Sequence, residues 1–319
     1  MHIVLTRPIH TSEARRLRDA GHQVTELADP GGLPPARIAP HCAGADAVIS
    51  HLTDTIDAAV LATPGLRVVA NVAAGYDNID LRAAASHDVV VTHTPGVLTE
   101  ASADLALALM LAVARHVPAG DAAVRSGGAG PWRLLHEPMG TDLSGAVLGI
   151  VGMGRIGRAA ARRARFGFGM EVLYTSRRPH PEAEEELGAT RVPLEALLSR
   201  SDIVSLHTAL TEETRHLINM DTLALMKPGA ILVNTARGGL IKEQDLAHAL
   251  IEGTLAGAGL DVFENEPEVH PALLACGSRT VLTPHIASAT AKTRLAMAAL
   301  AVDNVLAVLA GRPALHPVT

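Results

Sequence analysis

The sequence predicts an α/β protein with two doubly wound parallel-sheet domains. Short β-branched runs alternate with longer Ala-, Leu- and Arg-rich segments of helical character, a pattern typical of βαβ units. The length of 319 residues is enough for two domains of ordinary size. Hydrophobic residues make up 48% of the chain but aromatic residues only 2%. Ala, Val, Leu and Ile must therefore fill the cores, which suits parallel sheets covered by helices.

Charge and cysteine content restrict the classes of function. The formal net charge is −6 and the pI about 6.2, which argues against a nucleic-acid-binding or membrane-surface protein. The start MHIVLTRPIH lacks the apolar region of a signal peptide, and no uncharged stretch of about 18 apolar residues occurs. Cys42 and Cys276 form no disulfide or metal-binding pattern. We therefore expect a soluble cytoplasmic protein without a metal centre.

The expected elements fall into two series. In the first, strands are predicted at HIVLT, QVTEL, AVIS, RVVANV and VVVTH, with helices such as residues 12–20 and 81–85 between them. A helix, ASADLALALMLAVARH, is apolar nearly all round and predicted to be buried, and SGGAGPW is read as a loop. The second series runs through AVLGIVG, EVLYT, DIVSLH, AILVNT, LAGAGLDV and TVLTP. An Ala-rich helix from about residue 289 to residue 310 closes the chain, and periodicity does not decide which domain it joins.

The stretch LGIVGMGRIGR is the strongest single motif. Gly152, Gly154 and Gly157 follow a predicted strand and open the helical pattern RIGRAAARRARF. In a dinucleotide-binding turn the first glycine allows the tight turn, the second lets a pyrophosphate approach, and the third allows close helix–strand packing. The helix N-terminus then offers N–H groups and positive potential to the phosphates. This context disfavours the alternative, a glycine-rich turn without a ligand.

About 20 residues after such a motif, an NAD-binding protein normally places an Asp or Glu on the ribose. This chain has Thr175 and Ser176 there, followed by Arg177 and Arg178. A hydroxyl and two guanidinium groups suit the 2′-phosphate of NADP, and each charge-assisted bond is worth about 1.5–3 kcal/mol. The alternative is a solvated basic loop whose arginines balance the acids of PHPEAEEE. We expect NADP(H) as the preferred cofactor, with NAD(H) as the alternative.

Three polar residues follow the carboxyl ends of expected strands, where open α/β sheets bind ligands. They are Arg237 in VNTARGGL, Glu266 in LDVFENEP and His285 in LTPHIASAT. His207, at the end of SLH, is an alternative to His285 on the same grounds. Reducing a carbonyl group by hydride transfer needs a proton donor and positive charge on an adjacent carboxylate. A histidine beside a carboxylate suits the first task and an arginine the second. Taken singly, each residue could equally be an ordinary loop or surface side chain.

Five motifs together resemble those of the D-isomer-specific 2-hydroxyacid dehydrogenases, and within them the glyoxylate/hydroxypyruvate reductases. They are NVAAGYDNID, LGIVGMGRIGR, LMKPGAILVNTARGG, GAGLDVFENEP and TPHIASAT, and the resemblance covers nearly the whole chain. It implies a discontinuous flavodoxin-like substrate domain of residues 1–98 and 289–319, to which the closing helix returns. It also implies a Rossmann cofactor domain of residues 99–288 and an active site in the cleft between the domains.

The resemblance also implies roles for individual residues. Arg237 would hold the substrate carboxylate and carbonyl, His285 would be the acid/base, and Glu266 would hydrogen-bond that histidine. The amides of Ala74 and Gly75 would bind the carboxylate. Cofactor contacts are implied for Gly152, Gly154, Arg155, Ile156, Gly157, Ser176, Arg177, Arg178, His207, Thr208, Ala209, Thr235, Ala236, Asp261, His285 and Ser288.

Two further residues are candidates for the pocket of the substrate side chain, Leu52 and Trp132. Family members are usually homodimers, and in the reductases resembled here a tryptophan reaches into the partner's substrate pocket. Trp132, the only tryptophan, is placed for that role, and the alternative is a core or loop anchor.

The sequence favours a reductase of glyoxylate, hydroxypyruvate or a related small 2-keto acid with D stereospecificity. One alternative keeps the enzyme class: an NAD-dependent D-2-hydroxyacid dehydrogenase, or oxidation of phosphite, formate or 3-phosphoglycerate. The stretch NVAAGYDN lacks the lysine that would favour phosphite. The other alternative is a cofactor-sensing binding protein like the transcriptional corepressors that share this fold.

Overall fold

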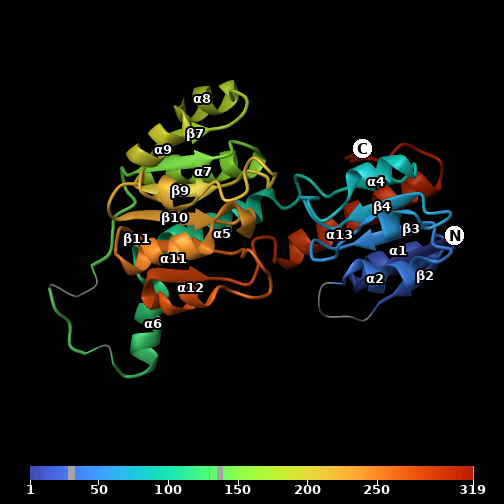
Figure 1. Ribbon diagram of the computed structural model, residues 1–319, viewed down its shortest axis with the longest axis horizontal. Helices are drawn as coiled ribbons and strands as arrows, with labels where there is room; N and C mark the ends of the chain where they lie inside the picture. The colour runs from blue at the N-terminus through green and yellow to red at the C-terminus, as the bar shows by residue number, and fades with distance from the viewer. Residues whose placement is uncertain (28–32, 129, 135–138, 319) are drawn as a thin grey trace. The chain divides into compact units, whose positions relative to one another are not determined.

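The chain folds into two compact units, each built on one sheet (Figure 1). The computed structural model describes residues 1–27, 33–128, 130–134 and 139–318. The first unit combines Met1–Leu98 with Ala289–Thr319, and the second unit is Thr99–Ser288. Within each sheet the paired strands run parallel. The predicted α/β class with two parallel-sheet domains is confirmed.

The first unit has the flavodoxin-like strand order β2-β1-β3-β4-β5. The order reverses between β1 and β3, so the carboxyl ends of these two strands flank a topological switch point. The strands are β1 (His2–Leu5), β2 (Gln23–Glu26), β3 (Ala47–Ser50), β4 (Val68–Asn71) and β5 (Val90–Thr92). The helices are α1 (Thr11–Asp19), α2 (Pro35–Ile38), the 3₁₀ helix η1 (Ala39–Cys42), α3 (Ala58–Leu61), α4 (Leu81–Ser86) and α13 (Ala291–Leu309).

Alternate residues of the first sheet face two layers of helices. Val4, Val48, Val69 and Val91 share one buried cluster with residues of α2, α3 and α4. Helix α13 packs against β3, β4 and α1, which places these two helices over the opposite face. Burial on both faces explains why these strands are continuous apolar runs rather than alternating ones.

The closing helix is attached to the first sheet. Arg67 donates hydrogen bonds to the carbonyl oxygens of Val308 at 2.9 Å and Leu309 at 3.3 Å, which satisfies the carbonyl end of α13. Beyond the helix, Val318 N donates to Val91 O at 2.8 Å. These contacts place the closing helix in the first unit, a question that periodicity left open.

The second unit has the strand order β12-β11-β10-β9-β6-β7-β8, which reverses between β6 and β9 as in Rossmann domains. The strands are β6 (Val147–Val151), β7 (Glu171–Thr175), β8 (Thr190–Arg191), β9 (Ile203–Leu206), β10 (Ala230–Asn234), β11 (Leu255–Leu260) and β12 (Thr280–Leu282). The helices are α5 (Thr99–Ala114), α6 (Val117–Arg125), α7 (Arg155–Phe168), α8 (Pro181–Leu187), α9 (Leu194–Arg200), α10 (Met220–Leu223), η2 (Gly238–Leu240), α11 (Glu243–Ile251), α12 (Pro271–Ala275) and η3 (Gly277–Arg279). Strand β8 has only two residues, too few to produce a period in the sequence.

The second sheet is also buried on both faces. Ile150, Val172 and Val233 belong to a cluster with residues of α5 and α7. Leu206, Leu232 and Leu260 belong to a cluster with residues of α9 and α11. Both clusters are aliphatic for the most part, as the scarcity of aromatic residues predicts.

Helix α5 is apolar on most sides because it is packed against the sheet. Small residues of β11 allow the close approach: a Cβ atom on Gly257 would lie 2.6 Å from Val113 Cγ1, and one on Gly259 would lie 2.9 Å from Leu109 Cβ. In the part of the chain that the structure describes, no single helix is long and apolar enough to cross a membrane. Only α5 and α6 taken together reach that length and composition, and they are bent by 62°.

Candidate active site

The glycine turn after β6 is shaped by contacts that leave no room for side chains. Gly152 has φ +99°, a conformation favoured by glycine, and a Cβ there would lie 2.7 Å from backbone atoms of His207 and Thr208. A Cβ on Gly157 would lie 2.2 Å from the carbonyl oxygen of Gly152. The first glycine is therefore required by the turn and the third by the close packing of α7.

Gly154 is open, with no atom within 4 Å of the position of a Cβ. Gly154 is the N-cap of α7 and, because it has no side chain, it makes no capping hydrogen bond to the N–H groups of the first turn. The first N–H groups of a helix have no partner within the helix, and the helix dipole adds positive potential there. A dinucleotide pyrophosphate fits this arrangement, with Arg155 and Ile156 contributing the first N–H groups of the helix.

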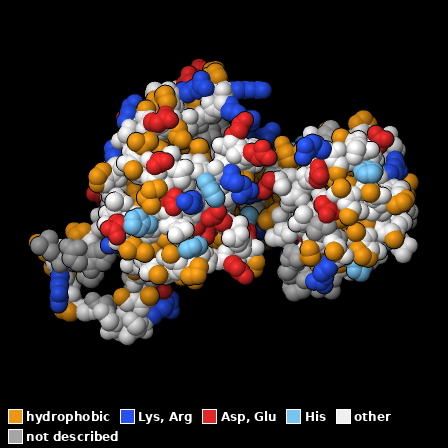
Figure 2. Space-filling model, in the orientation of Figure 1, with side chains coloured by type: hydrophobic (Ala, Val, Ile, Leu, Met, Phe, Trp, Pro, Cys, Tyr) orange, Lys and Arg blue, Asp and Glu red, His pale blue; other side chains and the backbone are white. Residues whose placement is uncertain are grey.

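The loop after β7 carries Ser176, Arg177 and Arg178. Both arginine side chains are exposed, and neither forms an ion pair with any residue in the described ranges. Lys and Arg side chains, blue in Figure 2, are prominent at the end of the second unit that carries α8. The loop therefore presents positive charge that the protein itself does not neutralise.

Two of the four acids of α8 have partners other than Arg177 and Arg178. Glu184 accepts a hydrogen bond from the hydroxyl of Tyr174 at 2.6 Å. Glu186 lies 2.8 Å from Arg158 and also pairs with Arg162, and these two arginines hold the pKa of Glu186 below its usual value. The alternative in which the loop arginines balance these acids receives no support from these contacts.

Asn234, the last residue of β10, shapes the turn that leads to Arg237. Its side chain accepts a hydrogen bond from Ala236 N at 2.9 Å and donates one to Arg237 O at 2.8 Å. Within this turn Thr235 is buried, and its Oγ1 has no hydrogen-bond partner in the described part of the chain. An unpartnered buried hydroxyl is costly, and a ligand group can satisfy it. Thr235 thus fits the predicted cofactor contact.

Glu266 and His285 form a hydrogen-bonded pair. The distance from His285 Nδ1 to Glu266 Oε2 is 2.8 Å, and the two side chains are only 20% and 24% exposed, respectively. The other Glu266 oxygen accepts from Phe263 N at 3.1 Å. Burial alone would raise the pKa of Glu266. The hydrogen bond to His285 and the charge of that ring oppose burial, as do the hydrogen bond from Phe263 N and the charge of Arg237. Together they hold this pKa below its usual value. Glu266 is therefore ionised at neutral pH, and Nε2 is the ring nitrogen left for a substrate.

Asp261 holds the backbone of His285 in an unusual conformation. His285 has φ +52°, in the left-handed region that few non-glycine residues adopt. The buried carboxylate of Asp261 accepts from the amides of Ile286 and Ala287, both at 2.8 Å, and from Thr283 Oγ1 at 2.6 Å. His285 N in turn donates to Asp261 O at 2.9 Å. Asp261 was predicted as a cofactor contact, and the structure shows that it anchors the histidine segment.

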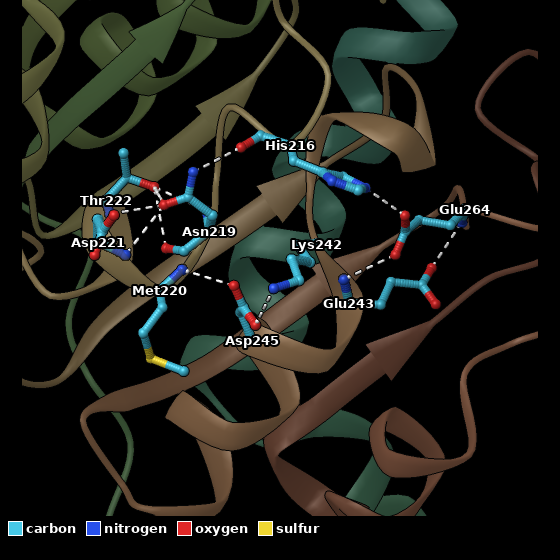
Figure 3. Close-up of polar contacts among 9 residues, drawn as sticks. All are labelled: His216, Asn219, Met220, Asp221, Thr222, Lys242, Glu243, Asp245 and Glu264. Atoms are coloured by element: carbon cyan, nitrogen blue, oxygen red, sulfur yellow. Dashed lines mark hydrogen bonds and ion pairs between the residues drawn. The ribbon is translucent and has the colours of Figure 1, made fainter.

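Glu243, Glu264 and His216 form a polar network (Figure 3). Glu243 Oε1 accepts from Glu264 N at 2.8 Å, and Glu264 Oε2 accepts from Glu243 N at 3.0 Å. The other oxygen of Glu264 lies 2.6 Å from His216 Nε2. Burial raises the pKa of Glu243. The network attaches the N-terminus of α11 to a residue two positions before Glu266.

The same view shows how α10 is attached to α11 (Figure 3). Asp245 accepts a hydrogen bond from Met220 N at 2.9 Å and lies 3.1 Å from Lys242 Nζ. Asn219 caps α10 by accepting from the amides of Asp221 and Thr222. Lys242 therefore has a local structural partner.

His207, the competitor of His285, has a different environment. Its Nε2 lies 2.9 Å from Ser205 Oγ, and burial lowers its pKa to about 4. Its ring is therefore neutral at pH 7, and a group that is not protonated cannot donate the proton in a reduction. Of the two histidines, His285 has the geometry of a proton donor.

In the first unit, the loop after β4 contains Ala74 and Gly75. Asn71 Nδ2 donates to Gly75 O at 3.0 Å, and the His93 ring lies 2.8 Å from Ala74 O. The N–H groups of Ala74 and Gly75 make no hydrogen bond to any other described residue. Two adjacent unbonded amides suit a carboxylate. Leu52 is half-buried after β3 and Trp132 is 85% exposed, and their contacts with a substrate stay predictions.

The sequence analysis missed some residues that shape the site. Gly238 is one: a Cβ there would lie 1.9 Å from Phe263 C and 2.4 Å from Glu264 N. Glu243 and Glu264 are others, because their role depends on contact between segments about 20 residues apart. Glu264 lies in the motif GAGLDVFENEP beside Glu266, whereas Glu243 lies outside all five motifs. Among the residues described, no group of three or more His, Cys, Asp or Glu could hold a metal ion.

Comparisons with known proteins identify relatives of this chain. Residues 107–287 match the family model described as D-isomer specific 2-hydroxyacid dehydrogenase, NAD binding domain. A glyoxylate reductase from Thermococcus litoralis is 50% identical over 270 residues, which cover 83% of this chain and 81% of that protein. A solved structure from Thermus thermophilus has a TM-score of 0.91 at 46% identity, with 100% of both chains covered. An NADPH-dependent glyoxylate/hydroxypyruvate reductase from Sinorhizobium meliloti, in complex with NADP and malonate, has a TM-score of 0.84 at 34% identity over 100% of this chain and 96% of that one.

The close approach at Gly238 yields a test of how the Arg237 and Glu266 segments are held together. Gly238→Ala should lower the free energy of unfolding by about 1–3 kcal/mol, because the new methyl group meets backbone atoms that have no room to move. Urea-induced unfolding followed by circular dichroism measures this change. Gly239→Ala is the matched control, since its Cβ would meet only ends of the Leu210 and Arg215 side chains, at 3.1 to 3.4 Å. Equal losses in both variants would contradict the interpretation.

Proposed function

The chain belongs to the D-isomer specific 2-hydroxyacid dehydrogenases, and from this premise we propose that it reduces glyoxylate or a related small 2-keto acid. Keto acids with a larger side chain would yield the D-2-hydroxyacid. The single observation that carries the proposal is the Glu266–His285 pair, with the charge of Arg237 close enough to lower the pKa of Glu266. The glyoxylate reductase from Thermococcus litoralis supports the choice of substrate.

Each residue of this group has one task. Arg237 binds the substrate carboxylate through its planar guanidinium group. His285 donates a proton from Nε2 to the carbonyl oxygen as that oxygen becomes an alkoxide. Glu266 holds Nδ1, which keeps the ring oriented and stabilises its positive charge. In the first unit, the contact of the Ala74 and Gly75 amides with a substrate carboxylate stays a prediction.

Gly152, Gly154 and the N-terminus of α7 would hold the pyrophosphate of a nicotinamide cofactor. When bound, that cofactor would supply a hydride to the carbonyl carbon of the substrate. We propose that NADP(H) is preferred, because the exposed Arg177 and Arg178 form no ion pair within the part of the chain that is described. The NADP complex of the Sinorhizobium meliloti relative supports this preference.

We also propose that the protein acts as a homodimer. Exposed apolar side chains gather in α6 and the segment after it: Val117 is 56% exposed, Val124 68%, Trp132 85% and Leu134 77%. Such a concentration of exposed apolar residues is typical of protein–protein contacts. Trp132 is proposed to reach the substrate pocket of the partner.

The direct test of the function is an assay of purified protein with NADPH or NADH and a panel of 2-keto acids. We expect consumption of NADPH with glyoxylate and hydroxypyruvate at ordinary enzymatic rates. Protein that binds the cofactor but oxidises it with no member of the panel would favour a binding protein over an enzyme. Activity only in the direction of phosphite or formate oxidation would also overturn the proposal.

Removal of the proton donor should abolish most of the activity. We expect His285→Ala to lower kcat by about 10²–10⁴, the usual contribution of general acid–base catalysis. The matched control is His248→Ala, which changes an exposed histidine on α11. A folded His285→Ala protein with near-normal kcat would move the proton donor elsewhere.

The charge of Glu266 should determine the pH range of the reductase. Because the pKa of Glu266 is held below its usual value, Glu266 stays an anion until the pH falls into the acid range. Reduction should therefore decline at acid pH, where Glu266 gains a proton and no longer offers His285 Nδ1 a charged acceptor. Glu266→Gln should remove this decline, because a neutral amide does not titrate, and should lower kcat/KM at every pH. The measurement is kcat/KM against pH, and superimposable profiles would refute the assignment.

The two loop arginines should determine the choice of cofactor. Replacing both Arg177 and Arg178 by Ala should raise the KM for NADPH by about 10-fold or more, because charge-assisted bonds to the 2′-phosphate are lost. The KM for NADH should change little, since NADH has no such group. Steady-state kinetics with both cofactors decides this, and an equal response would show that the arginines do not bind the 2′-phosphate.

A further inference from the structure

The loop with Ser176, Arg177 and Arg178 is held at its start by a third arginine. Arg191, the second residue of β8, donates from Nη2 to Ser176 O at 2.9 Å and to Arg177 O at 3.4 Å. Strand β8 pairs with β7 in parallel, with Arg191 opposite Tyr174. Arg191 thus comes from the neighbouring strand and lies beside the point where the loop leaves β7.

Tyr174 holds the other end of the loop. Its ring is fully buried, and its hydroxyl accepts from His180 N at 2.9 Å while donating to Glu184 at 2.6 Å. Within the loop, Ser176 Oγ donates to Arg178 O. Protein groups alone therefore fix residues 176–180 at both ends.

The Arg191 side chain is exposed and adds charge to the loop. Like Arg177 and Arg178, it forms no ion pair with any residue that the structure describes. A guanidinium group has five N–H donors, and Arg191 uses only Nη2 for the two carbonyl groups. Nε and Nη1 remain for an anion. Three guanidinium groups on or beside one short loop repel one another unless an anion lies between them.

We propose that Arg191 is a specificity-determining residue for the 2′-phosphate of NADP(H). It fixes the main chain of the loop through two carbonyl groups and adds a third cation to the site. Because the loop is already ordered, binding of the cofactor costs less conformational entropy. The inference rests on the proposed NADP(H) preference and extends that preference to a residue outside the dinucleotide-binding motif.

The experiment compares two nucleotides that differ at the ribose, 2′,5′-ADP and 5′-AMP. Their binding to the full chain is measured by isothermal titration calorimetry, which does not depend on catalysis. Arg191→Met should weaken binding of 2′,5′-ADP by about 10-fold or more, the effect of losing one charge-assisted bond, and leave 5′-AMP nearly unchanged. Arg191→Lys keeps the charge but not the fork of donors, so an intermediate loss is expected. The KM values for NADPH and NADH should follow the same order.

One further variant is a matched control, and another tests whether fixing the loop contributes to binding. Arg200→Met removes another exposed arginine, on α9, which pairs with Glu171 at 3.5 Å, and should leave both nucleotides unaffected. Tyr174→Phe keeps the buried ring but removes the hydroxyl that holds His180 N, and should weaken 2′,5′-ADP selectively because the loop is less well fixed.

Several outcomes would overturn the inference. If Arg191→Met weakens both nucleotides equally, the residue supports the domain rather than the 2′-phosphate. If neither nucleotide is affected, Arg191 has no role in the site. The Arg177 and Arg178 double variant separates this failure from that of the proposed function. A selective loss in that variant without one in Arg191→Met refutes only the present inference, whereas no selective loss in either refutes the NADP(H) preference itself.

Discussion

One buried carboxylate, that of Asp261, determines where His285 lies. The left-handed backbone of His285 costs about 1–3 kcal/mol. Hydrogen bonds from two amides and one hydroxyl to this side chain offset the cost, since each buried hydrogen bond is worth about 0.5–1.5 kcal/mol. Asp261 N also donates to Asn234 O at 2.9 Å, and Asn234 shapes the turn of Arg237. The arginine and the histidine are therefore held by adjacent ends of two neighbouring strands.

Environment rather than residue type assigns the roles of the titratable groups. Glu266 and Glu243 are both carboxylates, but a histidine and an arginine lower the pKa of the first, whereas burial raises that of the second. Glu266 therefore supplies charge to a neighbouring imidazole, and Glu243 supplies oxygen acceptors to main-chain amides. The histidines differ in the same way: burial holds His207 neutral, and His285 has an ionised partner. The chemistry follows from these surroundings.

Local sequence patterns were enough for the strands and the glycine turn, because both depend on neighbouring residues. The runs at 47–50 and 171–175 coincide with β3 and β7, and Gly152 has the positive φ that the tight turn requires. Contacts between distant segments left no such pattern. Gly238 is small because Phe263 lies against it, and Arg191 meets the loop only because β8 pairs with β7. The acid–base candidates came from strand ends, but their 2.8 Å contact required coordinates.

The sheet of the second unit separates the arginine loop from the Glu266–His285 pair. The arginine loop follows β7, whereas Glu266 follows β11, and β6, β9 and β10 lie between these strands. Four interstrand steps of about 4.8 Å place the two regions roughly 19 Å apart. In the function proposed above, an extended dinucleotide along the carboxyl edge of the sheet would cover such a distance, with its adenosine at the arginines and its reactive ring near His285. Because strand order sets this spacing, the charge of Arg177 and Arg178 lies well beyond a Debye length of about 8 Å from the Glu266–His285 pair. Substitutions in the arginine loop are therefore expected to leave that pair unaltered.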